Sequence, residues 1–495
     1  MKNILIQITI AIAILTLVSC DDFLDINPES EVVNDDMFSN KRGIEDAIYG
    51  LYGKMKSPTL YGENLAWAYT EVLAQNYNGP NALPYNDIEN YNFEDAKSDL
   101  GSIWQKAYEV IGHANNIIVN LEGKEAESYE LYHLYLGETY GIRAFLHFDL
   151  IRLFAPHIEQ EPEVKGIPYV KSYSFEHTDF SSVSAVYDFI IQDLKKAQEL
   201  LKADDEYVQY PRILASELNE EFLMGRQLHF NYYAATATLA RVYWMKGDLE
   251  KAKTEALKVI NSTKFPLVKK DEIVNLIAGH LSPKESIWGL FSTDYFNTTE
   301  TRLYQSTSWA SFSPYDPSSG GSYLMPYKSV YAQYQGENHG NDARLGWFRP
   351  AVEGGISPNC LKVVDVKRIN SGEGSDAGKE LIEGISMIRI PEMYYIASEA
   401  ELEAGNTEMA TQLIDEVLQS RGMTRLADRI PALTLDIDLL YNERHKELFG
   451  EGQRWFEMKK KNMDIVSNAE NKIIPASNDV YVLPIPIEEY EYRND

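Results

Sequence analysis

The sequence is poor in cysteine and in positively charged residues. Its 495 residues include two cysteines, Cys20 and Cys360, and 46 Lys and Arg against 75 Asp and Glu, a formal net charge of −29. If Cys20 is modified, no intrachain disulfide is possible, so the fold must depend on its hydrophobic core. The acidic residues are spread along the chain, and no basic stripe is available to release counterions from a nucleic acid. We therefore expect no nucleic-acid partner.

The sequence also lacks the short motifs that mark common catalytic and metal sites. It has no GxxxxGK(S/T) phosphate loop, no HExxH, no GxSxG and no CxxC. The histidines form no cluster with ligand spacing, and no acidic loop has the EF-hand pattern, so we expect no cofactor and no metal. Glycoside hydrolysis needs two facing carboxylates, but nothing in the sequence selects a pair among so many. We predict a protein that is not an enzyme, with a surface glycoside hydrolase as the alternative.

Long apolar runs are absent except at the N-terminus. Lys2 precedes an apolar run over residues 4–18 that is too short for a membrane span, and a small residue and Cys20 follow it. This pattern predicts a lipoprotein signal peptide over residues 1–19, with lipid attached to Cys20. An ordinary secretory signal followed by a chance cysteine is the alternative. Several acyl chains anchor firmly, because each buried methylene contributes about 0.8 kcal/mol. We expect residues 20–40 to form a tether to the folded part.

Apolar residues recur with helical spacing through much of the chain, as in residues 131–154. Two helical hairpins, residues 231–260 and 391–421, share a register of small residues around turns at Gly247 and Gly405. That register is typical of a tetratricopeptide unit, in which small residues let two antiparallel helices approach closely. Two unrelated hairpins are the alternative. Because the copies are far apart in the sequence, we expect no continuous solenoid.

Many of the 33 tyrosines lie in two polar segments, residues 77–93 and 294–327. Aromatic rings stack on the flat apolar faces of sugars, and Asn and Arg side chains bond the hydroxyls, so we predict a glycan surface on these loops. For any single residue, packing within the loop is the simpler interpretation, but the set favours a ligand surface. Both segments must then share one face of the fold. The residues expected to contact the ligand are Tyr77, Tyr85, Asn90, Tyr295, Arg302, Tyr304 and Trp309.

Three glutamates, Glu443, Glu447 and Glu451, recur at four-residue spacing. On one helix face they would repel one another unless cations oppose them. We therefore predict that they are buried in the core and paired. The candidate partners are Arg143, Arg152 and Arg454.

Four segments of the chain match, in order, the motifs of one known family. They are residues 20–25 with Pro28, residues 143–154, residues 443–459 and residues 483–486. Together they resemble the SusD/RagB family of nutrient-uptake lipoproteins from the Bacteroidetes. The resemblance covers nearly the whole chain, although the tyrosine-rich loops carry no family motif. Gly450 stands where a bulkier residue is expected, and His445 and Lys446 stand where the family has a more arginine-rich run. We expect these departures to touch the scaffold and to leave the resemblance intact.

The resemblance implies a mainly α fold, in which tetratricopeptide-like helical hairpins pack against a loop-rich ligand-binding part. It implies a helical N-terminal part over residues 41–270 and a C-terminal part over residues 271–495. It also implies a lipid-anchored, surface-exposed protein of the outer membrane. Such a protein captures glycans, or in some cases peptides, for import by a SusC-like TonB-dependent transporter. A helical scaffold for protein partners stays an alternative, beside the glycoside hydrolase.

Overall fold

The computed structural model describes the chain in segments. They are residues 37–78, 83–122, 129–210, 220–273, 280–282, 284–292, 295, 299, 313–314, 340–349, 359–360, 362, 382–467 and 472–491. The predicted signal peptide and Cys20 lie outside the described residues. The chain divides into a first unit, residues 1–47, and a second unit, residues 48–495. In the first unit, Asn40 Oδ1 accepts the Gly43 N–H over 3.1 Å and so caps helix α3 (Lys41–Met55), which continues into the second unit.

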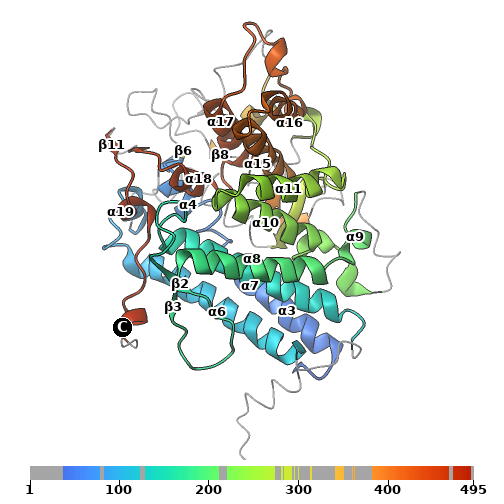
Figure 1. The fold of residues 1–495 in the computed structure, drawn as a ribbon, viewed down its shortest axis with the longest axis vertical. Helices are drawn as coiled ribbons and strands as arrows, with labels where there is room; N and C mark the ends of the chain where they lie inside the picture. The colour runs from blue at the N-terminus through green and yellow to red at the C-terminus, as the bar shows by residue number, and fades with distance from the viewer. Residues whose placement is uncertain are drawn as a thin grey trace, which may run out of the picture. The chain divides into compact units, whose positions relative to one another are not determined.

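Seven long helices of the described second unit pack side by side in one continuous stack (Figure 1). In their order in space they are α6 (Lys97–Glu122), α7 (Tyr132–Phe154), α8 (Val183–Leu200), α10 (Tyr232–Met245), α11 (Leu249–Asn261), α15 (Ile390–Glu403) and α16 (Thr407–Ser420). Each helix packs against the next, and α17 (Ile437–Leu448) packs against α15. The apolar side chains that repeat at helical spacing are buried between them. The prediction of a mainly α fold is confirmed.

The two predicted helical hairpins form the second half of this stack. The α10–α11 hairpin turns at Gly247 (φ +80°) and the α15–α16 hairpin at Gly405 (φ +82°), in the left-handed region that glycine adopts without strain. Residues 262–389 separate the hairpins in the sequence, yet α11 packs directly on α15. We expected no continuous solenoid, because the hairpins are far apart in the sequence. In the structure the two hairpins are adjacent and form one continuous stack, so this expectation is wrong. The second hairpin thus begins beside the helix where the first one ends, which sequence distance does not reveal.

Helix α7 lies inside the stack and is buried on nearly all sides. Its tightest contact is at Gly141, where a Cβ atom would come within 2.1 Å of the Phe230 ring. Phe230 immediately precedes the α10 cap, so this contact sets how closely the start of α10 approaches α7. The absence of a side chain at position 141 is thus a packing requirement of the stack.

We expect Gly141→Ala to lower the free energy of unfolding by about 1–3 kcal/mol, because the Phe230 ring must move within a packed core. Gly112→Ala in α6 is the matched control, because nothing lies within 4 Å of the added methyl group. Alanine favours a helix over glycine by about 1 kcal/mol, so the control variant should be stabilised. The midpoint of urea unfolding should therefore fall for Gly141→Ala and rise for Gly112→Ala. Equal stabilisation of both would contradict the close packing of α7.

Short antiparallel sheets and turns connect the helices. The largest described sheet has the strand order β4-β9-β5, and β9 leads directly into α15. Its strands are β4 (His280–Leu281), β5 (Ser286–Phe291) and β9 (Ile382–Arg389). The two-stranded sheets pair β1 (Tyr77–Asn78) with β6 (Ser313–Pro314), β2 (Lys165–Pro168) with β3 (Phe180–Ser182), β7 (Phe348–Arg349) with β8 (Asn359–Cys360), and β10 (Ile465–Val466) with β11 (Ile473–Ile474). The short helices are α4 (Tyr69–Leu73), α5 (Tyr85–Glu89), α9 (Asp204–Tyr207), α18 (Arg454–Lys460), α19 (Asn478–Tyr481) and α20 (Glu488–Glu491), with 3-10 turns at Glu221–Leu223, Arg226–Leu228, Lys270–Glu272, Ala343–Trp347 and Leu426–Asp428.

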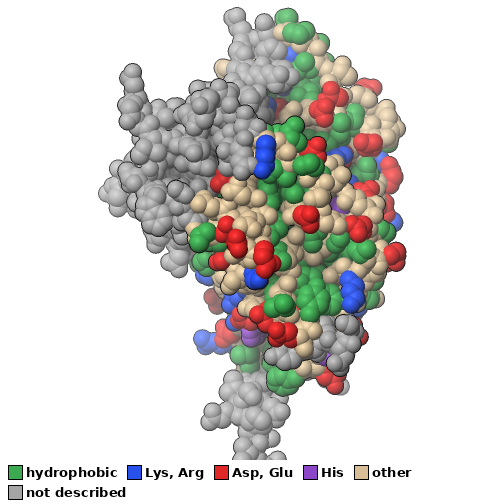
Figure 2. All heavy atoms as spheres, turned by 90° about the vertical axis from the view of Figure 1, so that its left-hand side faces the viewer, with side chains coloured by type: hydrophobic (Ala, Val, Ile, Leu, Met, Phe, Trp, Pro, Cys, Tyr) green, Lys and Arg blue, Asp and Glu red, His purple; other side chains and the backbone are tan. Residues whose placement is uncertain are grey.

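The C-terminal segment returns to the first helices of the stack. The Leu483 N–H donates to the Leu153 carbonyl over 2.9 Å, and Trp104 Nε1 donates to Glu489 Oε1 over 3.0 Å. Among the described helices, none combines the length and the apolar composition that crossing a bilayer requires. On the face shown in Figure 2, Asp and Glu side chains are scattered over the described surface and do not gather into one patch.

The three glutamates of α17 and its C-terminal extension are buried, as predicted. The side chains of Glu443 and Glu447 have no exposed surface, and that of Glu451 is 12% exposed. Among the described residues they belong to a buried ion cluster of five carboxylates and five cations: Glu285, Asp342, Arg344, Lys362, Arg389, Arg421, Glu443, Lys446, Glu447 and Glu451. The balance of charge offsets part of the cost of burying ions. Burial raises the pKa of Glu443, but Lys446 and Arg344 outweigh it and lower this pKa to about 2.

The prediction that Arg143, Arg152 and Arg454 pair with these glutamates is wrong. The three arginines bind other carboxylates, in the pairs Arg143–Asp193, Arg152–Asp149 and Arg454–Glu457. Glu447 Oε1 instead accepts hydrogen bonds from Arg389 over 2.9 Å and from Arg421 over 2.8 Å. These two arginines flank the α15–α16 hairpin, and α17 packs on α15. Four-residue spacing predicts that cations must oppose α17, but not which elements supply them.

Candidate functional site

The first tyrosine-rich segment follows α4, and buried polar side chains hold its base. Asn76 is 1% exposed; its Nδ2 donates to Glu71 Oε2 over 2.7 Å, and its Oδ1 lies 2.7 Å from His445 Nε2. The Gly452 N–H donates to Glu71 Oε1 over 2.8 Å. Burial raises the pKa of Glu71 and lowers that of His445, so the imidazole is neutral. Because an amide oxygen only accepts, His445 carries its proton on Nε2. We call Glu71, Asn76, His445 and Gly452 the loop clamp.

The loop clamp ties the first segment to the C-terminal motif, residues 443–459. His445 lies on α17 of the helical scaffold, and its ring also bonds Asn76, next to the start of β1. The carboxylate of Glu71 has no exposed surface, so its bond to the Gly452 N–H forms away from competing water. The position of the first tyrosine-rich segment is therefore fixed by residues almost four hundred positions further along the chain.

The same segment also closes on itself. Gln75, with φ +58°, donates from Nε2 to the Glu89 carbonyl over 2.9 Å. The Tyr91 hydroxyl donates to the Leu73 carbonyl over 2.6 Å. These bonds join the two ends of the segment across α5. Residues 83–91 are thus tied back to the C-terminal end of α4, which is the kind of rigid support that a binding surface needs.

The second tyrosine-rich segment meets the first in a two-stranded sheet. Strand β1 pairs with β6, with Tyr77 opposite Pro314 and Asn78 opposite Ser313. Strand β6 also contacts β8, which pairs with β7. More than two hundred residues separate β1 from β6 in the sequence. The geometric requirement that both segments come together is therefore met by the backbone.

The predicted ligand residues differ in their exposure to solvent, and some of them lie outside the described residues. Tyr85 is 9% exposed, its hydroxyl donates to Glu63 Oε1 over 3.0 Å, and its ring packs edge-on against Tyr69. Tyr295 is 5% exposed, so neither ring presents a face for stacking in this conformation. Asn90 is exposed and donates from Nδ2 to the Asn86 carbonyl over 2.7 Å. Tyr77 is described only as part of β1, and the remaining predicted residues, Arg302, Tyr304 and Trp309, lie outside the described residues.

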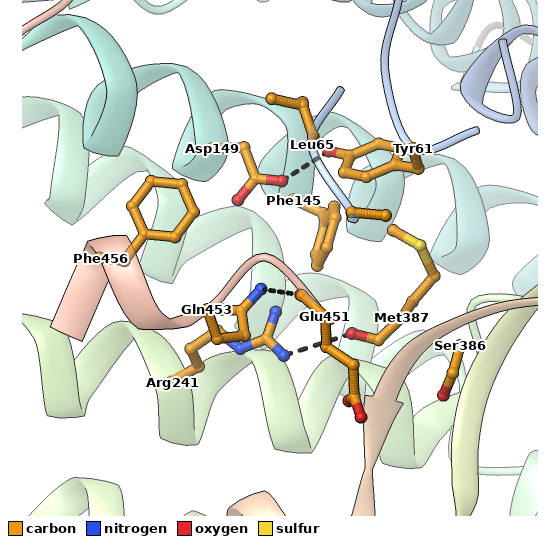
Figure 3. Close-up of a pocket in the computed structure, with 11 residues that line it drawn as sticks. Tyr61, Leu65, Phe145, Asp149, Arg241, Ser386, Met387, Glu451, Gln453 and Phe456 are labelled. Atoms are coloured by element: carbon orange, nitrogen blue, oxygen red, sulfur yellow. Dashed lines mark hydrogen bonds between the residues drawn. The ribbon is translucent and has the colours of Figure 1, made fainter. Parts of the chain in front are cut away.

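A small internal cavity lies between α7, α10, β9 and residues 451–456 (Figure 3). Three hydrogen bonds cross or border it, from Tyr61 to Asp149, from Arg241 to the Met387 carbonyl, and from the Gln453 side chain to the Glu451 carbonyl. Its volume of about 20 Å³ has room for a single water molecule and none for a sugar ring. In the described part of the chain, no group of three His, Cys, Asp or Glu side chains is arranged to bind a metal ion.

Comparison with known proteins identifies the family. The model described as "Starch-binding associating with outer membrane" matches residues 22–244, and the model described as "SusD family" matches residues 292–490. The chain belongs to the SusD family. A curated relative, the SusD-like protein P2 of Formosa agariphila, is 24% identical over 97% of this chain and 96% of its own length. The first family description associates its members with the outer membrane.

Solved SusD-type structures share the fold of this SusD-family chain. A SusD superfamily protein from Bacteroides thetaiotaomicron superposes with a TM-score of 0.68 at 19% identity, covering 91% of this chain and 97% of that one. A structure named as a laminarin-binding SusD-like protein superposes with a TM-score of 0.64 at 18% identity, covering 91% and 97%. Three of the four segments that resemble the family, residues 143–154, 443–459 and 483–486, lie in the described part of this fold, and the first segment lies outside it.

Proposed function

We propose that this SusD-family protein captures glycans at the bacterial surface and delivers them to a SusC-like TonB-dependent transporter, without cleaving them. Lipid on Cys20 would hold it on the outer face of the outer membrane. The observation that carries the proposal is the agreement of two SusD-family matches, over residues 22–244 and 292–490, with a fold that joins both tyrosine-rich segments at β1 and β6. The transporter and the lipid anchor rest on the family resemblance and the sequence of residues 1–22.

We place the ligand surface over the β1–β6 pair. The loop clamp and the Gln75 and Tyr91 bonds give this region a fixed base, so a ligand would meet a preformed surface. Tyr85 and Tyr295 are buried and would support the surface from below. The contacting residues in this proposal are Tyr77, Asn90, Arg302, Tyr304 and Trp309.

Glycan-array binding, combined with an assay for new reducing ends, tests this proposal. The array includes laminarin, the ligand in the name of one structural neighbour. We expect binding without release of reducing ends. Release of reducing ends would favour the hydrolase, and binding to peptides in place of glycans would favour the peptide alternative. Failure to bind any glycan or peptide would favour the scaffold.

A double variant, Tyr77→Ala with Tyr304→Ala, tests the placement of the surface. Each stacked ring contributes on the order of 1 kcal/mol, so the loss of two rings should weaken glycan binding roughly 30-fold. Tyr173→Ala is the matched control, because Tyr173 is 59% exposed and lies between β2 and β3, outside both segments. Titration calorimetry with the best glycan from the array gives the affinities. Unchanged affinity in the double variant would place the ligand elsewhere.

A further inference from the structure

A groove large enough for a ligand lies beside the last helices of the helical stack. It is a groove of about 760 Å³ between the C-terminal end of α16, Tyr394 of α15, and residues 267–271. This volume falls within the range of about 300–1,000 Å³ that is usual for ligand sites. The isolated bridge between Gly340 and Met423 reaches its wall, so the chain after the second tyrosine-rich segment comes back at this groove.

Two exposed lysines on the groove, Lys269 and Lys270, have no carboxylate within ion-pair distance in the described part of the chain. Their neighbours along the sequence behave differently. Five lysines each lie within 3.2 Å of a carboxylate, in the pairs Lys251–Asp248, Lys253–Glu250, Lys258–Glu255, Lys264–Asp205 and Lys284–Glu272. Lys195 and Lys196 of α8 are likewise adjacent, exposed and without an ion pair among the described residues, but they do not line this groove, whereas Lys269 and Lys270 do. No described carboxylate holds either ammonium group in an ion pair, and, after the hydrogen bond from Lys284, the charge of Lys269 contributes to lowering the pKa of nearby Glu272.

The groove is held in shape by the buried ion cluster. Arg421, the residue that follows α16, donates to the Val268 carbonyl over 2.7 Å, and the Val268 N–H donates to Glu285 over 2.7 Å. One arginine thus ties both walls of the groove together. Lys270 packs over Gly422, which has φ +86°, and a Cβ atom at Gly422 would come within 3.2 Å of Lys270 Cδ. The stem of Lys270 is therefore positioned by the turn that ends α16.

The rest of the lining supplies hydrogen-bond acceptors as well as donors. Glu416 accepts from the Tyr394 hydroxyl, and this bond adds to burial in raising the pKa of Tyr394. Ser420 Oγ donates to the Val417 carbonyl and accepts from Arg421 Nη1 over 3.1 Å, so one lone pair is left for a ligand. Asp271 and Gln419 complete the polar lining. A bare anion would use only the lysines, whereas a sugar hydroxyl can donate to these acceptors, so the lining fits a sugar that carries one negative group.

We infer that this groove binds an anionic substituent of a glycan, a carboxylate or a sulfate, at Lys269 and Lys270, while Asp271, Gln419 and Ser420 bond the sugar hydroxyls. The inference deepens the proposed function, because it assigns an acidic class of glycan to a site distinct from the β1–β6 surface. The net charge of −29 opposes an approaching polyanion, but at 0.15 M salt charges more than about 8 Å away are largely screened. Close to the groove, the two lysines then contribute most of the electrostatic potential that an anion meets.

Binding of defined oligosaccharides by the full chain tests the inference. The probes are tetragalacturonate, its methyl ester as the neutral match, and a sulfated tetrasaccharide. We expect the wild type to bind at least one anionic probe at least tenfold more tightly than the methyl ester at about 0.15 M salt, where the net charge of the chain is screened. Preference for the uronate or for the sulfated probe identifies the anion, and each supports the inference. Equal affinity for the neutral ester and both anionic probes would overturn it.

The double variant Lys269→Ala with Lys270→Ala should lose at least tenfold in affinity for the anionic probe and should bind with a weaker dependence on salt. The matched control is Lys251→Ala with Lys258→Ala, because these α11 lysines are exposed and paired with their own helix. Lys269→Arg with Lys270→Arg keeps the charge and should retain binding. All four lysines are exposed, so the fold should persist, as circular dichroism can verify. If the alanine variant binds as the wild type does, while Tyr77→Ala with Tyr304→Ala abolishes binding, the inference fails and the proposed function stands. If the wild type binds no glycan, both fail.

Discussion

Replacing Glu447 by glutamine is expected to lower the free energy of unfolding by about 3–5 kcal/mol. The variant keeps the shape of the side chain and removes its charge. Glu447 accepts hydrogen bonds from Arg389, Arg421 and Arg344, and all three guanidinium groups are at most 4% exposed. Burial raises the pKa of Glu447, but Arg421 and Arg389 outweigh it and hold this pKa well below its usual range. Without the carboxylate, the described part of the buried ion cluster carries one more positive than negative charge.

Urea unfolding of Glu447→Gln measures this loss against Glu199→Gln as the control. Glu199 lies on the exposed face of α8 and takes no part in the buried ion cluster. The control should change the free energy of unfolding by less than about 0.5 kcal/mol. A loss below about 1 kcal/mol in Glu447→Gln would mean that water reaches the buried ion cluster. It would also remove the reason for treating the groove beside Arg421 as rigid.

Helical periodicity predicted the elements of this fold but not their order in space. The small residues around Gly247 and Gly405 identify both hairpins, because close helix packing and a left-handed turn leave a local mark on the sequence. The contact between α11 and α15 leaves no such mark. It depends on where residues 262–389 return, and this is decided by the pairing of β9 with β4 and β5.

For the charged residues too, local spacing predicts which side chains need partners but not which residues supply them. Spacing alone indicates that Glu443 and Glu447 need cations, since like charges on one helix face repel. The choice of Arg143 and Arg152 followed from their place on a motif helix, but each has a nearer carboxylate on α8 or α7. The positions of Arg389 and Arg421 in the sequence could have identified them as the partners of Glu447. Arg389 and Arg421 bracket the second hairpin, where a side chain at a helix end can reach the next helix.

The composition of the two tyrosine-rich segments predicts a ligand surface, which stays a prediction, and it does not specify the role of each side chain. The tyrosine-rich segments do meet at β1 and β6, but burial of Tyr85 shows that a loop tyrosine can serve as core. Composition does not separate these roles, because a tyrosine has an apolar ring and a polar tip that suit both. The bond between Asn76 and His445 was not predicted either, because it joins residues that no local pattern connects.

The second large effect is expected at the predicted lipid anchor, and Cys20→Ala should abolish the incorporation of labelled palmitate. Cys20 follows an apolar run and a serine, the arrangement in which the cysteine sulfur accepts lipid. Several acyl chains make anchoring effectively permanent, whereas one chain binds only reversibly. The chain therefore depends on this one residue for membrane attachment in our proposal.

Cys360→Ala is the matched control, because it removes the only other cysteine of the chain and should leave labelling unchanged. Since Cys20→Ala also removes the expected cleavage point, an uncleaved apolar leader would confuse a fractionation experiment. A second variant therefore replaces residues 1–20 by a secretory signal that is cleaved before Asp21. This variant should leave the membrane fraction entirely and still bind glycan, because the β1–β6 surface and its loop clamp lie in the second unit, far along the chain from the anchor. Palmitate on Cys20→Ala, or a variant without Cys20 that stays with the membranes, would show that attachment does not depend on this cysteine.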